Sequence, residues 1–101
     1  MSLVENRFGQ GLYFLDEPEA ALSAQRQLEF LILLDSIVGQ DSQLVIATHS
    51  PIIMSYPNAK IYSFSEAGIV PIAYQDTEHY RVTKSFLDNP ERMLGHLLDG
   101  L

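Results

Sequence analysis

The chain has 101 residues, of which 47% are hydrophobic, and a formal net charge of −7 from thirteen acids and six bases. This length favours a single domain over residues 1–101, and the composition is typical of a packed core rather than of disorder. The acidic charge argues against nucleic-acid binding by this segment, because a phosphate backbone repels it. No apolar run is long enough for membrane insertion, and no signal peptide is recognisable. The absence of cysteine excludes disulfides and fits a reducing compartment such as the cytoplasm.

The first predicted elements are a strand and a helix, separated by acidic residues. Residues 11–16 are a continuous β-prone apolar run, as expected for a strand covered on both faces, and Pro18 stops it. Ser23 is a suitable N-cap for a helix over 24–38, which Gly39 ends. Apolar residues recur at helical spacing and extend around this helix, so we predict that it is largely buried.

A second apolar strand, residues 43–48, ends at His49-Ser50-Pro51. Strand, helix and strand in this order predict a parallel, right-handed βαβ unit. A short helical turn near 52–55 follows.

The last part of the chain predicts a hairpin and two helices. Residues 60–65 and 69–74 are β-prone and flank a turn containing Gly68, while Pro71 places the second strand at a sheet edge. Thr77 and Glu78 begin one helix, and Asn89-Pro90 separates it from a last helix over 91–99. The first three residues can be a remnant of cloning.

Three polar side chains are candidates for a functional site. Asp16 and Glu17 follow the first strand, and His49 follows the next. Ligands bind at the carboxyl ends of strands in a parallel α/β sheet, so we expect these side chains at one edge, one or two strand spacings of about 5 Å apart. Two acids and a histidine suit a divalent cation, a general base and a contact to an anion.

Acids and histidines also follow strands simply because loops are polar. The joint occurrence of an apolar strand, Asp-Glu-Pro, a helix and a second strand ending in Thr-His-Ser-Pro favours the functional interpretation for Asp16, Glu17 and His49. The two interpretations are balanced for Ser23 and Gln25. His79 and His96 are interpreted as structural, since each lies in a predicted amphipathic helix without a constellation of acids around it.

The segment LYFLDEPEAALS resembles the Walker B motif and D-loop of ABC-type ATPases, and LVIATHSP resembles their switch-histidine loop. The soluble AAA-, RecF- and OLD-like ATPases are more similar than the transporters, because Ser50-Pro51 follows His49. The motifs support the resemblance over about residues 8–65.

The resemblance implies a role for each matching residue. Asp16 would hold Mg²⁺ through water, Glu17 would orient and polarise the attacking water, and His49 would contact the γ-phosphate. Residues 19–23 match the D-loop, which in the family reaches across a dimer interface, and Ser23 belongs by this match to the ATP-binding residues. Phosphoryl transfer requires such a metal, a positioned water and charge-stabilising donors.

Two motifs of the family are missing. The phosphate-binding loop G-x-x-x-x-G-K-[ST] cannot be formed around either lysine, Lys60 or Lys84, and no Ser-Gly-Gly-like signature precedes the first strand. The resemblance therefore implies a partial P-loop NTPase fold of the ABC type that lacks the P-loop strand. We expect these residues to be the C-terminal part of an ATPase whose complete form hydrolyses ATP with Mg²⁺. We expect no hydrolysis by these residues alone.

Two other functions remain open. The chain can be a non-enzymatic dimerisation or regulatory module, or a metal-dependent phosphoesterase that uses Asp16, Glu17, Glu19 and His49. In the family, the P-loop strand lies beside the switch-histidine strand. Without it, we expect the edge of strand 43–48 to recruit a second copy of the chain or to be closed by strand 60–65.

Overall fold

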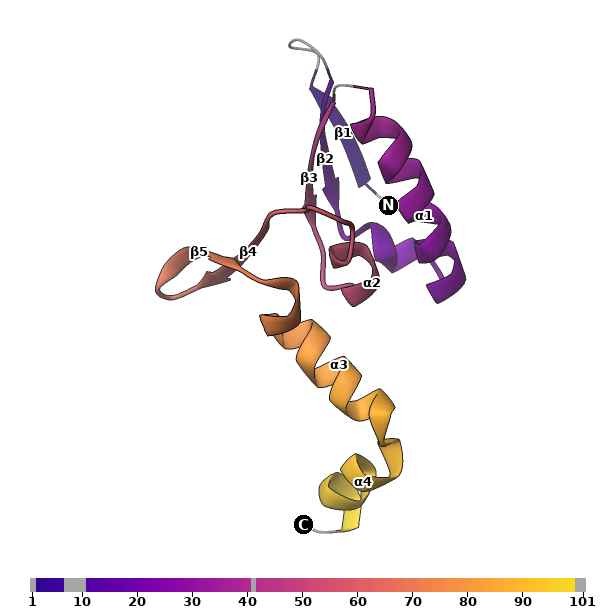
Figure 1. The fold of residues 1–101 in the computed structure, drawn as a ribbon, viewed down its shortest axis with the longest axis vertical. Coiled ribbons are helices and arrows are strands. Elements are labelled where there is room, and N and C mark those ends of the chain that lie inside the picture. The colour runs from indigo at the N-terminus through magenta and orange to yellow at the C-terminus, as the bar shows by residue number, and fades with distance from the viewer. Residues whose placement is uncertain (1, 7–10, 41, 100–101) are drawn as a thin grey trace. The chain divides into compact units, whose positions relative to one another are not determined.

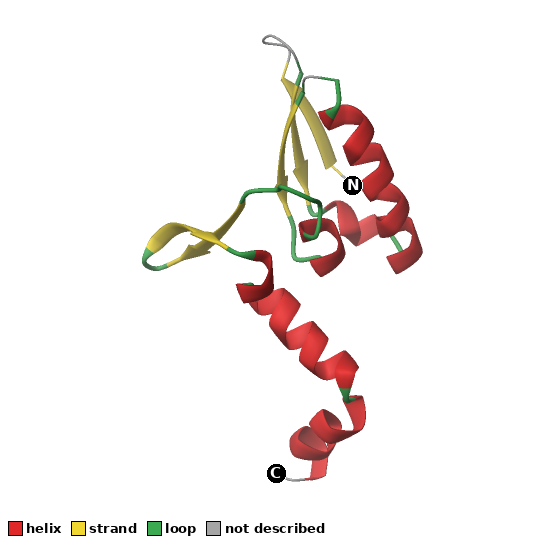
Figure 2. Ribbon diagram, in the orientation of Figure 1, coloured by secondary structure: helices red, strands yellow, loops and turns green. Residues whose placement is uncertain are grey.

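The structure is a computed structural model that describes residues 2–6, 11–40 and 42–99. The chain divides into two compact units, residues 1–59 and 60–101, which are described separately here. The first unit contains a three-stranded sheet with helices, and the second contains a two-stranded hairpin followed by helices (Figures 1 and 2). The chain is thus mixed α/β, as predicted.

The sheet of the first unit contains the predicted parallel pair. Strand β2 (Leu12–Asp16) pairs in parallel with β3 (Gln43–Ala47), and helix α1 (Ala24–Val38) connects the two. At the start of β2, Gly11 has φ 88° and its carbonyl accepts a hydrogen bond from Gln43 N at 3.0 Å. A side chain at Gly11 would approach Ser42 Oγ to 2.9 Å, so a larger residue would disturb this junction.

A third strand was not predicted from the sequence. Strand β1 (Ser2–Asn6) pairs antiparallel with β2, and the sheet order is β1-β2-β3. Residues 2 and 3, which the sequence allowed as a remnant of cloning, belong to this strand. Its conformation follows from pairing with β2 rather than from a local pattern, which is the usual weakness of strand prediction.

Helix α1 begins and ends where its sequence predicts. Ser23 Oγ accepts a hydrogen bond from Arg26 N at 3.2 Å, which is the N-cap interaction. Gly39 follows the last helical residue, and its N–H donates to Asp35 O at 3.1 Å. Tyr56, beyond the short helix α2 (Pro51–Met54), donates from its hydroxyl to Asp35 Oδ1 at 2.8 Å and so ties the two helical segments together.

The core of the first unit lies between α1, α2 and one face of the sheet. Its buried members are Leu15, Phe30, Leu34 and Ile53. Six further hydrophobic side chains pack against them: Tyr13, Leu22, Leu31, Leu44, Ile46 and Tyr56.

The prediction that α1 is largely buried is wrong for this structure. Only Phe30 and Leu34 are buried in the helix. The outward side carries four exposed hydrophobic residues: Leu28, Ile32, Leu33 and Val38. The sequence correctly predicts a wide apolar stripe on α1. The described residues cover only the side of this stripe that faces the sheet.

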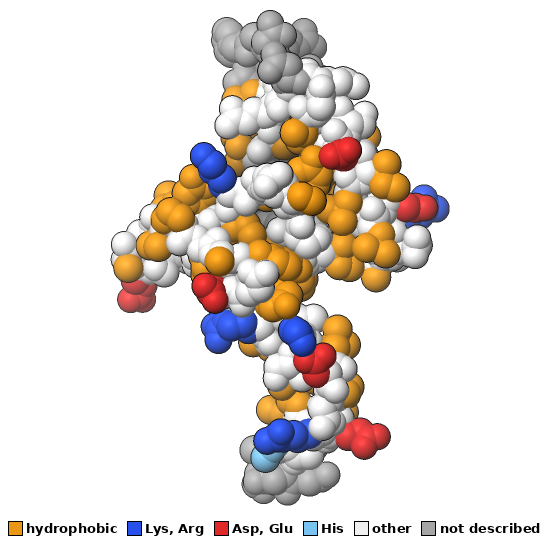
Figure 3. All heavy atoms as spheres, in the orientation of Figure 1, with side chains coloured by type: hydrophobic (Ala, Val, Ile, Leu, Met, Phe, Trp, Pro, Cys, Tyr) orange, Lys and Arg blue, Asp and Glu red, His pale blue; other side chains and the backbone are white. Residues whose placement is uncertain are grey.

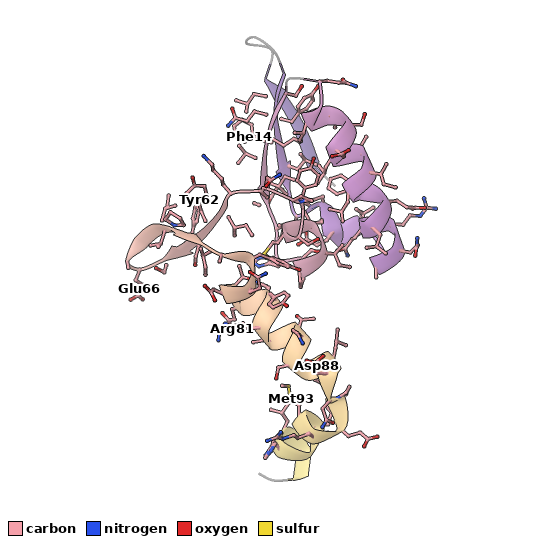
Figure 4. All side chains as sticks on the ribbon, in the orientation of Figure 1. Phe14, Tyr62, Glu66, Arg81, Asp88 and Met93 are labelled. Carbon is pink, nitrogen blue, oxygen red and sulfur yellow. The ribbon has the colours of Figure 1, made fainter. Side chains whose placement is uncertain are left out.

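The prediction that β2 is covered on both faces is also wrong. Phe14 and Val45 are register partners on neighbouring strands, and they are 42% and 45% exposed. Phe14 lies on the side of the sheet away from α1 (Figure 4). Side chains alternate along a strand, so Leu15 enters the core while its neighbour remains outside. One face of the sheet is therefore apolar and exposed.

Strand β3 lies at the edge of the sheet, and strand 60–65 does not close that edge. Strand β4 (Ile61–Ser65) pairs instead with β5 (Gly68–Ile72) in a separate antiparallel hairpin. Pairing within the hairpin is favoured over pairing with β3, because a tight turn brings β4 and β5 together at little entropic cost. Gly68, which has φ 108°, is the register partner of Ser65 and allows this turn.

The second unit exposes much of its apolar surface. The hairpin carries four exposed large hydrophobic residues, which are Tyr62, Phe64, Ile69 and Val70. Hydrophobic atoms are visible over the hairpin in Figure 3, and Tyr62 is labelled in Figure 4. Pro71 lies in β5, where a two-stranded sheet consists only of edge strands, as predicted.

The C-terminal helices follow their capping residues. Helix α3 (Glu78–Asp88) begins after Thr77, whose hydroxyl accepts from Tyr80 N at 3.3 Å, and α4 (Pro90–Leu94) begins after Asn89. The predicted helix over 91–99 changes to a π-helix at Gly95–Asp99. No helix in the described residues is both long and apolar enough to cross a membrane.

Candidate functional site

The carboxyl ends of β2 and β3 bring the predicted acids and histidine together. Asp16 is the register partner of Ala47, and Glu17 N donates to Ala47 O at 2.7 Å, which continues the strand pairing by one residue. The segment after β2 and the segment after β3 therefore run side by side. His49 Nε2 lies 3.4 Å from Glu17 Oε1.

The Glu17–His49 contact is open to solvent. The two side chains are 54% and 69% exposed, and an exposed ion pair contributes only about 0–1 kcal/mol to stability. A contact this weak does not hold two loops together. The site is therefore accessible to a ligand, and its geometry must be maintained by other residues.

Glu17 has an unusual backbone. Its φ of 47° and ψ of 56° lie in the left-handed region, which costs a non-glycine residue about 1–2 kcal/mol. This conformation ends β2 abruptly and starts a 3₁₀ helix, Pro18–Ala21, whose first residue is fully buried. Strained residues cluster at functional sites, where the surrounding structure fixes them. The turn leaves the Glu17 carboxylate exposed beside His49.

Glu19 contacts the segment after β3 with both carboxylate oxygens. Thr48 Oγ1 donates to Oε1 at 2.6 Å, and the backbone N–H of His49 donates to Oε2 at 2.8 Å. Hydrogen bonds to an ionised carboxylate are roughly twice as strong as those between neutral groups. Glu19 thus makes a stronger connection between the two segments than the exposed Glu17–His49 contact.

Ser50 extends this network into the core. It is 5% exposed, its hydroxyl donates to Gln27 Oε1 on α1, and the same oxygen accepts from Ile53 N at 3.2 Å as the N-cap of α2. Its backbone N–H donates to Thr48 Oγ1 at 3.0 Å. No buried polar side-chain atom of the described residues lacks a hydrogen-bond partner.

Sequence reasoning did not assign Gln27, Thr48 or Ser50 to the site. Ser50 followed by Pro51 is a recognisable N-cap and first helical position, so the start of α2 could have been placed from this pair. The hydrogen-bond partners of Glu19 and Gln27 could not be predicted from a local pattern, because Glu19 and Thr48 are 29 residues apart in the chain.

The pKa of the Glu19 carboxyl is lowered from its ordinary value. Partial burial raises it, but the hydrogen bonds from the Thr48 hydroxyl and the His49 N–H outweigh burial and favour the ionised form. A carboxyl with a depressed pKa in the folded state stabilises the fold at pH values above its unfolded pKa. That stabilisation is lost as the pH falls through the lower, folded pKa.

We therefore expect the stability difference between the unaltered chain and Glu19→Gln to be full above about pH 4.5 and to shrink as the pH falls below that value. Thermal unfolding followed by circular dichroism between pH 3 and 7 measures it. The comparison of the two proteins cancels the contribution of the other acids. A difference that stays constant across this range would contradict the assigned hydrogen bonds.

Asp16 is the candidate ligand for Mg²⁺. It is exposed at the end of β2, and no three His, Cys, Asp or Glu residues in the described part of the chain form a metal-binding group. Magnesium is commonly bound by one or two carboxylates together with water and substrate phosphates. A single exposed carboxylate is compatible with an Mg²⁺ ion that arrives together with phosphates, and this role of Asp16 stays a prediction, since the described residues do not form a metal cage of their own.

The remaining predicted residues make none of the contacts described above. The structure shows Ser23 as the N-cap of α1, and an ATP contact for it stays a prediction. Gln25 is exposed in the first turn of α1, His79 lies in α3, and His96 lies exposed in the π-helix. Comparison with known protein families, curated proteins and solved structures returns no match to this chain.

Proposed function

We propose that the chain supplies the Walker B, D-loop and switch-histidine part of an ABC-type ATPase. The observation that carries this proposal is the position of Glu17 and His49, 3.4 Å apart at the carboxyl ends of two parallel strands. A water and a terminal phosphate have to meet at such a pair for hydrolysis, and both side chains are open to solvent.

Each of the three residues has a distinct task in this proposal. The carboxylate of Glu17 accepts a hydrogen bond from the attacking water and orients it. His49 donates from its ring to the terminal phosphate, where charge develops. Asp16 holds Mg²⁺, which neutralises charge on the phosphates when it is bound.

The 101 residues contain no phosphate-binding loop of the G-x-x-x-x-G-K-[ST] type. The proposal therefore assigns catalysis to a protein or assembly in which another segment provides that loop. Backbone N–H groups of such a loop hold the phosphates, and the present residues contribute the hydrolytic side of the site.

Calorimetric titration of Mg-ATP into this chain and into the complete natural protein that contains it tests the proposal. We expect heat of binding and ATP hydrolysis only for the complete protein, and loss of the magnesium dependence of binding in Asp16→Ala, because that variant removes the metal ligand. Glu29→Ala, which removes an exposed carboxylate of α1, is the matched control. A complete protein that neither binds nor hydrolyses ATP would refute the ATPase assignment.

The same titration distinguishes a second candidate function, an association module. Its support is the edge position of β3 and the exposed apolar pair Phe14 and Val45, because exposed edges and apolar faces recruit other chains. If the chain is an association module, sedimentation equilibrium should give a homodimer that responds neither to Mg-ATP nor to Glu17→Gln.

The phosphoesterase alternative has less support, since two-metal sites require more ligands than the described residues bring together.

A further inference from the structure

The Glu17–His49 contact is exposed to solvent, and the backbone that carries His49 is held by other residues. The position of the His49 ring depends on the path of residues 48–50, which lead from β3 to α2. Two hydrogen bonds hold this path from the side of β2, and both end on Glu19. A third, from Ser50 to Gln27, holds it from the side of α1.

These bonds form a directed chain. Ser50 N donates to Thr48 Oγ1, and Thr48 Oγ1 donates to Glu19 Oε1, so the single hydroxyl proton of Thr48 is committed to the carboxylate. His49 N donates to the second carboxylate oxygen. Glu19 thus accepts from two neighbouring residues at once, one on each carboxylate oxygen. Alanine offers no acceptor oxygen in the side chain, and a neutral amide offers only one.

We propose that Glu19 is a positioning residue, whose carboxylate holds Thr48 and the His49 backbone so that the His49 ring lies beside Glu17. Glu19 does not touch a substrate in this proposal. It acts through the backbone of His49, and Thr48 and Ser50 transmit the constraint to the start of α2. The catalytic consequence rests on the proposed function, whereas the positioning itself does not.

The test is a double-mutant comparison by NMR on the 101-residue chain, with the ¹⁵Nε2 resonance of the His49 ring as the readout. In the unaltered background, Glu17→Gln should shift this resonance, because the two groups are 3.4 Å apart. In the Glu19→Ala background the shift should be lost, since the ring no longer lies beside residue 17. The His49 amide should also exchange about tenfold faster with solvent, because a hydrogen bond to a charged group is lost.

Glu29→Ala is the matched control, because Glu29 is exposed on α1, where its carboxylate lies 3.7 Å from Arg26 Nε. In that background the shift caused by Glu17→Gln should persist. If Glu17→Gln shifts the His49 ring resonance equally in the Glu19→Ala background, and that chain is folded, the proposal is overturned.

Thr48→Val keeps the test decisive if Glu19→Ala does not fold. It removes one hydroxyl and retains the shape of the side chain, and we expect a reduced shift in the same comparison. An unchanged shift would overturn the proposal. No nucleotide is used, so a chain that positions His49 as described and a protein that fails to hydrolyse ATP are separate outcomes.

Discussion

We expect Glu17→Gln to lower the rate of ATP hydrolysis about 10²–10⁴-fold in a protein that supplies the phosphate-binding loop, with little change in Mg-ATP binding. Glutamine matches the shape of glutamate but cannot accept a proton from the attacking water. The carboxylate is exposed, so its replacement by an amide leaves no buried charge unpaired. Steady-state turnover together with calorimetric binding separates the loss of chemistry from the loss of affinity.

Glu29→Gln is the control for this variant, because it makes the same chemical change at an exposed position on α1. We expect turnover equal to that of the unaltered protein. If Glu17→Gln also retained full turnover, then Glu17 would not be the residue that activates water, and the assignment of the site would have to be abandoned.

A second large effect is expected in the core. Phe30→Ala should lower the free energy of unfolding by about 3–5 kcal/mol, which is a large share of the total for a small domain. Phe30 is buried against β2 and α2, so its loss removes apolar burial and leaves a cavity. Urea unfolding followed by circular dichroism measures the difference, and a chain already unfolded without urea also meets the expectation.

Ile32→Ala is the comparison on the same helix. Ile32 is 73% exposed, so this substitution should change the free energy of unfolding by less than about 0.5 kcal/mol. Equal effects of the two substitutions would mean that the outer side of α1 is covered in solution, as in a self-associated form of the chain.

The local chemistry of the sequence determines most element boundaries. Ser23 and Thr77 act through their own side chains on backbone groups three residues away, and such interactions are readable in the sequence. The continuous apolar runs likewise predict β2 and β3, and the helix between them predicts their parallel pairing. The positions of Asp16, Glu17 and His49 at one edge follow from that pairing.

The features that could not be predicted depend on segments far apart in the chain. Strand β1 exists because its backbone pairs with β2. The exposure of Ile32 and Phe14 depends on which faces other segments cover, whereas the apolar pattern records only which residues can be buried. The contact of Glu19 with Thr48 and His49 depends on how the two loops meet.

The parallel pairing of β2 with β3 also has a consequence for synthesis on the ribosome. β2 emerges first, and its partner β3 emerges only after the whole of α1 has been translated. At about 5–20 residues per second, β2 waits for roughly one to five seconds before it can pair in parallel. The hairpin β4–β5 has no such delay, because its strands are joined by a tight turn. During that interval the strand partner available to β2 in the first unit is β1, and the edge of β2 that later takes β3 stays exposed.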